Sequence, residues 1–267
     1  DYLAAGIDPT LTTICLQSAL SALAELTALY MNIVTVARVE RNPTVKNEIA
    51  QKGFARSLPV GFLVYPISQA ADISAFKAEV VPVGDDQLPM REQPNEIAHK
   101  MNSLLPAPVL RHCKAMLSDT SRLPGIDGSA KMSKSLGNTL LLSASEETIH
   151  RAVSAMYTDP THLKVSDPGQ IDGNVVFTYL DAFHPDKAKV AAMKAHYQQG
   201  GLGDRTCKNE LEVCLQELIA PMRERRATYI QDKGTLMSLL KKGSERAHDI
   251  TQQTLLEVKL GLGVPVF

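Results

Sequence analysis

Two lysines three residues apart stand in the pentapeptide Lys131-Met-Ser-Lys-Ser135, which follows a turn containing Gly125 and Gly128. Ammonium and hydroxyl groups at this spacing suit a polyphosphate, and the glycines allow the loop to move. Lysine and arginine clamps stabilise the charge that develops on phosphoryl oxygens. The loop therefore predicts a nucleotide from which pyrophosphate departs. A lone Lys-x-x-Lys is more often a solvated surface loop, but the full pentapeptide after a Gly-Asp-Gly turn favours the functional interpretation.

An acidic residue in an apolar setting marks a second candidate site. Asp72 ends the stretch that begins at Tyr65, and small or apolar residues surround it. A carboxylate in such a place is costly unless it binds a donor. On spacing alone, a structural role, in which Asp72 caps a helix or pairs with a basic neighbour, is an equal alternative.

A third candidate follows a short apolar run. The run ends at Gly84, and two carboxylates, Asp85 and Asp86, come next. Ligands of open α/β sheets bind beyond the carboxyl ends of the strands, although Gly-Asp is also common in turns. Lys46 is a further phosphate candidate because it lies near an expected helix N-terminus. Most lysines at such positions are only solvated.

The elements that must position these residues fall into two patterns. Up to residue 142, apolar runs alternate with helical spacing, which is typical of an α/β domain with a parallel sheet. We expect strands at 13–16, 61–65 and 79–83, with Pro82 at a strand end or an edge, and helices near 26–33, 43–52 and 70–77. We therefore predict a Rossmann-like domain over 1–142.

From residue 143 the pattern is helical. Ser143 and Glu146 fit a capping box, and the first helix has the apolar face of an amphipathic helix. Its predicted buried face is Ile149, Ala152, Val153 and Met156, and further helices are expected near 190–197, 211–226 and 244–259. We predict an all-helical second domain over 143–267.

Composition narrows the class of protein. The 267 residues carry 28 basic and 29 acidic side chains, a net charge of −1, so any contact with nucleic acid must rest on local patches. The cysteines at 15, 113, 207 and 214 form no Cys-x-x-Cys pair, and we expect no metal site and no disulfide framework. Without an apolar run of 18 residues or a leader pattern, we expect a cytoplasmic protein with no membrane span.

Taken together and in order, these stretches resemble the tryptophanyl-tRNA synthetases, which are class I aminoacyl-tRNA synthetases, and Lys131 to Ser135 matches the signature loop of that class. Any one match could be accidental, but the ordered set is specific and covers nearly the whole chain. The matching segments are 1–9, 65–72, 81–87, 123–135, 172–184, 200–204 and 221–226. The resemblance implies a Rossmann-like catalytic domain, followed by a helical domain that reads the anticodon, in a homodimer.

The resemblance also assigns residue roles. It implies that Asp72 accepts the indole N–H of tryptophan, in an apolar setting that suits a ring donor. The other residues implied to bind tryptophan are Tyr65, Gln69, Val81, Val83, Gly84 and Gln87. Those implied to bind ATP are Gly84, Asp85, Asp86, Leu123, Lys131, Met132, Ser133, Lys134 and Ser135, with Lys46 added from its helix position. Lys131 and Lys134 are the catalytic candidates.

The implied reaction joins tryptophan to tRNA(Trp) in two steps. The tryptophan carboxylate attacks ATP, held with Mg²⁺, to give tryptophanyl-adenylate, and the aminoacyl group then passes to tRNA. Two features keep alternatives open. Gln69 stands where many members carry Met, and tyrosine-specific synthetases also use a Gln three residues before this Asp. The family's His-Ile-Gly-His-like element is absent, because the chain begins after its place, so a non-catalytic paralogue is the other alternative.

Overall fold

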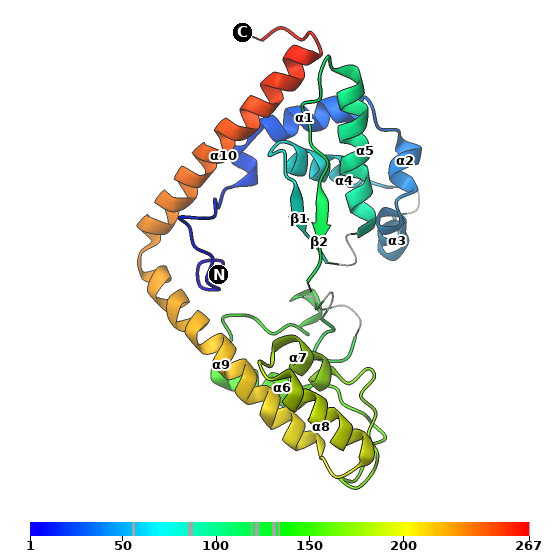
Figure 1. The fold of residues 1–267 in the computed structure, drawn as a ribbon, viewed down its shortest axis with the longest axis vertical. Coiled ribbons are helices and arrows are strands. Elements are labelled where there is room, and N and C mark those ends of the chain that lie inside the picture. Colours follow the sequence, from blue (N-terminus) through cyan, green and yellow to red (C-terminus); the bar gives the residue numbers. More distant parts are fainter. Residues whose placement is uncertain are drawn as a thin grey trace. The chain divides into compact units, whose positions relative to one another are not determined.

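The computed structural model describes residues 1–54, 57–84, 88–118, 120, 123–129, 132 and 134–266 (Figure 1). The chain forms two compact units. We call residues 9–121 and 235–267 the sheet unit, and residues 1–8 and 122–234 the loop unit. Each unit has its own buried hydrophobic cluster. The functional division at residue 142 into a catalytic and an anticodon-binding domain stays a prediction.

The sheet unit places a small parallel sheet among helices. In chain order its elements are the 3₁₀ helix Gln17–Ala19, α1 (Ser21–Met31), α2 (Val36–Glu40), α3 (Pro43–Lys52), α4 (Val60–Ser74), β1 (Val80–Pro82), α5 (Leu88–Leu104), β2 (Lys114–Met116) and α10 (Lys233–Gly261). Within the described residues, β1 and β2 form one parallel pair in which Val81 lies opposite Ala115. The strand expected at 79–83 is confirmed, and Pro82 ends it as predicted.

Small side chains allow the central helices of the sheet unit to pack closely. Ala70 and Ala71 of α4 are fully buried, and so are Leu26 and Tyr30 of α1, which packs against α4. The Tyr30 hydroxyl lies 2.7 Å from the Ser74 hydroxyl. That pairing satisfies two polar groups inside the apolar contact, which would otherwise be costly to bury.

α10 returns to the sheet unit and joins the chain's early residues. The Leu16 N–H donates to the Ser244 hydroxyl at 2.9 Å. A Cβ on Gly243 would lie 2.1 Å from the Ile14 carbonyl oxygen, so this crossing requires glycine. The extended residues 13–16 are therefore fixed against α10 and not within a sheet.

The loop unit is a helical assembly. Its helices are α6 (Glu146–Ala155), α7 (Val175–Phe183), α8 (Lys187–Gln199) and α9 (Asp204–Gln231), and α9 packs on both α6 and α7. The predicted apolar face of α6 is buried, as expected. The cap differs from the prediction, because the side chain of Ser145, and not that of Ser143, accepts from the Thr148 N–H.

A partly exposed ionic group links α8 to α9. The Glu210 carboxylate contacts the Lys189 ammonium and lies 3.0 Å from His184 Nε2. The hydrogen bond from Lys189 and then that from His184 lower the pKa of Glu210 below its ordinary value of 4.5. Ionised Glu210 therefore stabilises the folded loop unit.

Several other expectations are confirmed and several are wrong. α3 is confirmed: Asn42 caps its start, and Gly53, with φ 62°, ends it. The strand expected at 61–65 is wrong, because these residues open α4. The strand expected at 13–16 is also wrong, and the last helix begins at Lys233, well before the expected start. In the described part of the chain, no helix has the length and apolar character needed to cross a membrane.

Candidate active site

One face of α4 carries three of the predicted substrate residues. Tyr65, Gln69 and Asp72 are spaced by four and three residues, so their side chains leave the helix on the same side. All three are half-buried. α4 thereby brings together a phenol, an amide and a carboxylate at the edge of the hydrophobic cluster of the sheet unit.

Asp72 has a neutral partner. The Gln17 amide donates to both carboxylate oxygens of Asp72, at 2.9 and 2.8 Å. Among the described residues no cation pairs with Asp72, so pairing with a basic neighbour is not what holds this carboxylate. Burial raises the pKa of Asp72 above its ordinary value, and the hydrogen bond from Gln17 opposes that rise. A partly desolvated carboxylate of this kind is a strong acceptor for an N–H donor.

Tyr65 is held by its neighbours as a neutral phenol. Its hydroxyl donates to Glu48 at 3.1 Å, and the Phe62 ring packs edge-on with centroids 5.4 Å apart. Burial, followed by the hydrogen bond to Glu48, raises the pKa of Tyr65 to about 12. The side chain therefore supplies a fixed ring and keeps its proton at neutral pH.

The end of β1 holds the next predicted residues. Val81 and Val83 lie two residues apart and share one side of the extended chain, and both are half-buried, as is Gly84. The Val83 N–H donates to the Met116 carbonyl at 3.0 Å, which continues the pairing with β2 past Pro82. Asp85, Asp86 and Gln87 lie outside the described residues.

Lys46 stands in the first turns of α3, as expected. It lines a pocket of about 560 Å³ that Glu40, Arg41 and Ile49 also line. Arg41 next to Lys46 gives this pocket two cations and one carboxylate. The two cations suit an anion.

The loop unit carries the stem of the Lys131–Ser135 loop, which we define as residues 123–129 and 134–138. Asp127 accepts at one oxygen, Oδ1, from the Ser129 N–H at 3.0 Å, the Ser129 hydroxyl at 2.8 Å and the Asn138 amide at 3.1 Å. The Asn138 side-chain amide also donates to the Ser129 hydroxyl at 2.8 Å, and the backbone carbonyl of Asn138 accepts from the Ile126 N–H at 3.1 Å. The two ends of the loop are thus joined.

Two glycines allow the stem to close. A Cβ on Gly125 would lie 2.2 Å from the Asn138 amide nitrogen. Gly128 has φ 81°, and a Cβ there would lie 3.0 Å from the Tyr157 ring. Tyr157 also donates its N–H to the Ile126 carbonyl at 3.0 Å. At these two positions the glycines permit close packing of the stem.

The predicted loop residues fall into three groups. Leu123 and Met132 pack against the hydrophobic cluster of the loop unit. Lys134 begins the 3₁₀ helix Lys134–Leu136, is exposed, and has no carboxylate partner among the described residues. Lys131 and Ser133 lie outside the described residues, and Ser135 is described by its backbone alone.

The sequence reasoning missed two residues of these sites, Gln17 and Asn138. Gln17 is 55 residues from Asp72 in sequence, and no local pattern predicts that contact. Asn138 offered a weak signal, because a Gly-Asn pair after a loop often marks a turn. Its burial, with 3% of its surface exposed, shows that it belongs to the stem and is not a surface turn residue.

The family model for class I tRNA synthetases of tryptophan and tyrosine (W and Y) matches residues 1–220. The tryptophan–tRNA ligase of Streptococcus pyogenes serotype M3 is 52% identical over 272 residues, covering 100% of this chain and 80% of that protein. The ligase of Streptococcus agalactiae serotype V is 51% identical with the same coverage.

Solved structures agree. The tryptophanyl-tRNA synthetase of Campylobacter jejuni, solved with ADP and tryptophan, has a TM-score of 0.78 and 27% identity, and the match covers 98% of this chain and 80% of that one. The Mycoplasma pneumoniae enzyme has a TM-score of 0.80 over 98% of this chain and 80% of that one, and at 22% identity it supports the fold alone. The fold is that of a class I synthetase, mostly helical with a small parallel sheet in the described residues. The chain belongs to the class I tRNA synthetases for tryptophan and tyrosine and, within them, to the tryptophan–tRNA ligases.

Proposed function

We propose that this protein activates L-tryptophan with ATP and transfers it to tRNA(Trp). The observation that carries the proposal is the match to tryptophan–tRNA ligases over the whole chain, at 52% identity. The half-buried Asp72, which has a neutral amide as its partner, supports the choice of a ligand with an N–H donor. Asp72 thus gives this chain a residue able to bind the ring N–H of tryptophan, the amino acid that the relatives' name specifies.

Asp72 selects tryptophan by accepting the indole N–H. Its present donor, the Gln17 amide, occupies both oxygens, so the ring must share or replace that donor. Tyr65, Gln69, Val81, Val83 and Gly84 complete the amino-acid pocket, and Gln87 contacts the amino-acid end of the ligand. A ring without this N–H would leave the Asp72 carboxylate without that donor, and this cost selects against such amino acids.

The phosphate part of the site rests on the loop. Lys131 and Lys134 bind the triphosphate and stabilise the charge that develops as pyrophosphate leaves. Met132, Ser133 and Ser135 shape the loop around ATP, Leu123 packs the adenine, and Gly84, Asp85 and Asp86 approach ATP from the strand end. Lys46 adds a cation from α3. Mg²⁺ arrives with ATP, since it prefers phosphate oxygens and water to an all-protein cage.

The chemistry needs no general base in the first step. The tryptophan carboxylate is ionised well above its pKa of about 3.5, and it attacks the α-phosphorus of ATP. Tryptophanyl-adenylate forms and pyrophosphate leaves. The terminal ribose of tRNA then takes the aminoacyl group and releases AMP. The protein supplies positioning and charge stabilisation.

The remaining assignments follow the family. We propose a Rossmann-like catalytic domain over 1–142 and a helical anticodon-binding domain over 143–267, in a cytoplasmic homodimer. A tyrosine-specific synthetase is the second candidate, and the half-buried Gln69 on the face of Asp72 is the observation that favours it. A non-catalytic paralogue is a third, and the exposed Lys134 opposes it, because a protein that only binds RNA has no need of a pyrophosphate clamp.

Amino-acid-dependent exchange of pyrophosphate into ATP tests the proposal on the full-length protein. Exchange that depends on tryptophan, with tyrosine at background, supports it. Exchange with tyrosine indicates the second candidate. Exchange with none of the amino acids indicates the paralogue.

A further inference from the structure

A cationic pocket lies between α10 and residues 9–14 of the sheet unit. Its volume is about 540 Å³, within the range of roughly 300–1,000 Å³ that is usual for small-molecule sites. None of the residues assigned to tryptophan or ATP lines it.

The pocket is built by a close contact between its two walls. α10 approaches the early chain where Gly243 meets the Ile14 backbone, and the hydrogen bond from Leu16 to Ser244 fixes the adjoining residues. The walls separate beyond this crossing. The hollow is therefore a consequence of a fixed contact and not a gap between loose segments.

The chemistry of the lining is that of an anion site. Lys242 and Arg246 both line the pocket, and no carboxylate is among its described lining residues. Hydroxyl groups come from Thr12 and Thr13 on one wall and from Ser238 on the other. In a chain with a net charge of −1, this is a local concentration of positive charge and hydroxyl donors.

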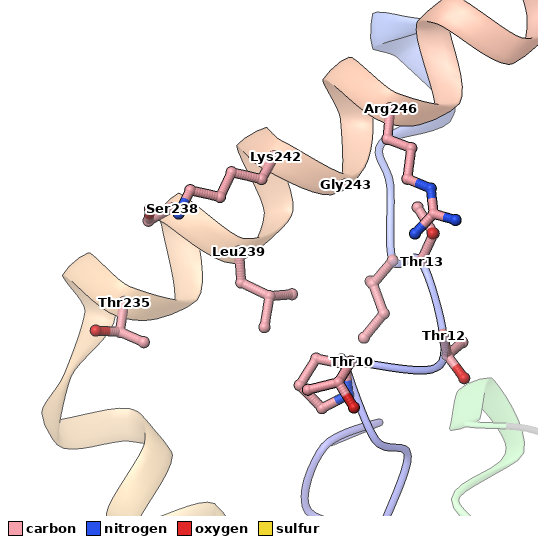
Figure 2. Close-up of a pocket in the computed structure, with 11 residues that line it drawn as sticks. Thr10, Thr12, Thr13, Thr235, Ser238, Leu239, Lys242, Gly243 and Arg246 are labelled. Atoms are coloured by element: carbon pink, nitrogen blue, oxygen red, sulfur yellow. The ribbon is translucent and has the colours of Figure 1, made fainter.

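The cations are available to a ligand. Neither Lys242 nor Arg246 forms an ion pair with any residue that the structure describes. By contrast, Lys241, on the adjoining face of α10, lies 3.9 Å from Glu245. Figure 2 shows Arg246 extending from α10 toward Thr13, and Leu239 pointing into the hollow. Residues 238, 242 and 246 repeat every four positions, so they lie along one face of α10.

We propose that this pocket binds a phosphate group, with the Arg246 guanidinium as the main contact, the hydroxyls of Thr12 and Thr13 on the facing wall, and Lys242 as a second positive charge farther along α10. A guanidinium presents paired donors that match phosphate oxygens, and hydroxyls complete such contacts. The phosphate has two possible sources, a backbone phosphate of tRNA or free inorganic phosphate. The tRNA source rests on the proposed function, while the phosphate chemistry does not.

The first experiment measures binding of a tRNA(Trp) transcript to full-length protein as salt is varied. Arg246→Ala should weaken binding by about tenfold, the loss expected for a charge-assisted hydrogen bond. It should also reduce the salt slope by about one unit, as loss of one phosphate contact does. Lys241→Ala is the matched control, since it removes a cation from the same helix outside the pocket and should change neither. Thermal unfolding and tryptophan-dependent pyrophosphate exchange, which needs no tRNA, should be unchanged in both variants.

The second experiment titrates inorganic phosphate into full-length protein with labelled threonine methyl groups. Chemical shift changes at Thr12 and Thr13 that occur in the parent and are lost in Arg246→Ala support the phosphate site, whatever the tRNA result. If tRNA binding is unchanged in Arg246→Ala, the same shift changes identify free phosphate as the ligand. Weakened tRNA binding in Arg246→Ala, but not in Lys241→Ala, supports a backbone phosphate. Unchanged tRNA binding together with no phosphate shifts overturns the proposal. A parent that binds phosphate but not tRNA contradicts the proposed function and leaves the pocket standing.

Discussion

Replacing Asp72 with Asn should weaken tryptophan binding while leaving the fold of α4 intact. In the parent protein the carboxylate offers two oxygens, and the Gln17 amide lies within 2.9 Å of both. An Asn at this position keeps one acceptor oxygen for Gln17 and loses the charge. The indole N–H and the Gln17 amide would then compete for a single neutral acceptor.

The expected size follows from this geometry. A hydrogen bond to a charged acceptor contributes about 1.5–3 kcal/mol and one to a neutral acceptor about 0.5–1.5 kcal/mol. Asp72 is half-buried, so solvent screening lowers the difference, and we expect about 1–2 kcal/mol. That loss corresponds to about 5- to 30-fold weaker tryptophan binding.

The assay is equilibrium binding followed by ligand fluorescence. The 267 residues contain no Trp, so they add no indole emission of their own. Glu25→Gln is the control, because it removes a carboxylate of the same unit from an exposed pair with Lys259 and should bind tryptophan as the parent does. Because burial raises the pKa of Asp72, the tryptophan affinity of the parent should begin to fall at a higher pH than it would with an Asp of ordinary pKa. The Asn variant should lack that fall.

Two results would refute the reasoning. Tryptophan affinity that is equal in Asp72→Asn and in the parent would mean that Asp72 does not accept the indole N–H. Full-strength binding of tryptophan methylated on the indole nitrogen would lead to the same conclusion, because that ligand has no ring N–H.

Lys134→Ala should raise the barrier to adenylate formation, measured in a single turnover, by about 2–4 kcal/mol, the range for one donor at a developing oxyanion. Tryptophan affinity should stay within about twofold of the parent, the size of experimental error. An unchanged rate in a folded variant would mean that the loop is only a surface feature. Gly128→Ala should lower the free energy of urea unfolding more than Gly137→Ala, since both have positive φ (81° and 67°) but only Gly128 has a ring in the way; equal losses would reject the packing argument. Glu210→Gln should lower the free energy of unfolding at pH 7. Because the pKa of Glu210 is lowered in the folded protein, the difference in unfolding free energy between parent and variant should shrink as the pH falls below about 4.5. Urea unfolding at several pH values checks this, and a difference that does not change with pH would contradict it.

The sequence predicted elements whose signals are local. The caps of α3 directly adjoin it, Asn42 before its first residue and Gly53 after its last, so they could be read directly. The buried face of α6 follows from its spacing, and the strand at β1 from its β-branched residues and the proline that ends it. In each case the cause of the structure is contained in about ten neighbouring residues.

The errors have physical reasons. The run at 61–65 is apolar throughout, and such a run fits a buried strand and a buried helix equally well. α4 continues through Pro66, which lies inside the helix. Residues 13–16 have strand propensity, but they pack on α10, where the Leu16 N–H finds the Ser244 hydroxyl 228 residues away. No pattern within the segment contains that partner.

The candidate site divides in the same way. Residue types and order singled out the Lys131–Ser135 loop and Asp72 as candidates, but they did not predict that Tyr65, Gln69 and Asp72 share one helix. The network of Asp127, Ser129 and Asn138 below the loop, and the donation from Gln17 to Asp72, depend on tertiary contacts. These contacts determine which donors a carboxylate already binds, and the spacing of residues along the sequence does not contain that information.

The most direct test of the central claim is aminoacylation of two tRNA transcripts by the full-length protein. With labelled tryptophan and tyrosine offered in parallel, the account predicts that tRNA(Trp) is charged with tryptophan, and that neither amino acid is attached to tRNA(Tyr). Charging of tRNA(Tyr) with tyrosine, or no charging of either tRNA by a folded protein, would contradict it.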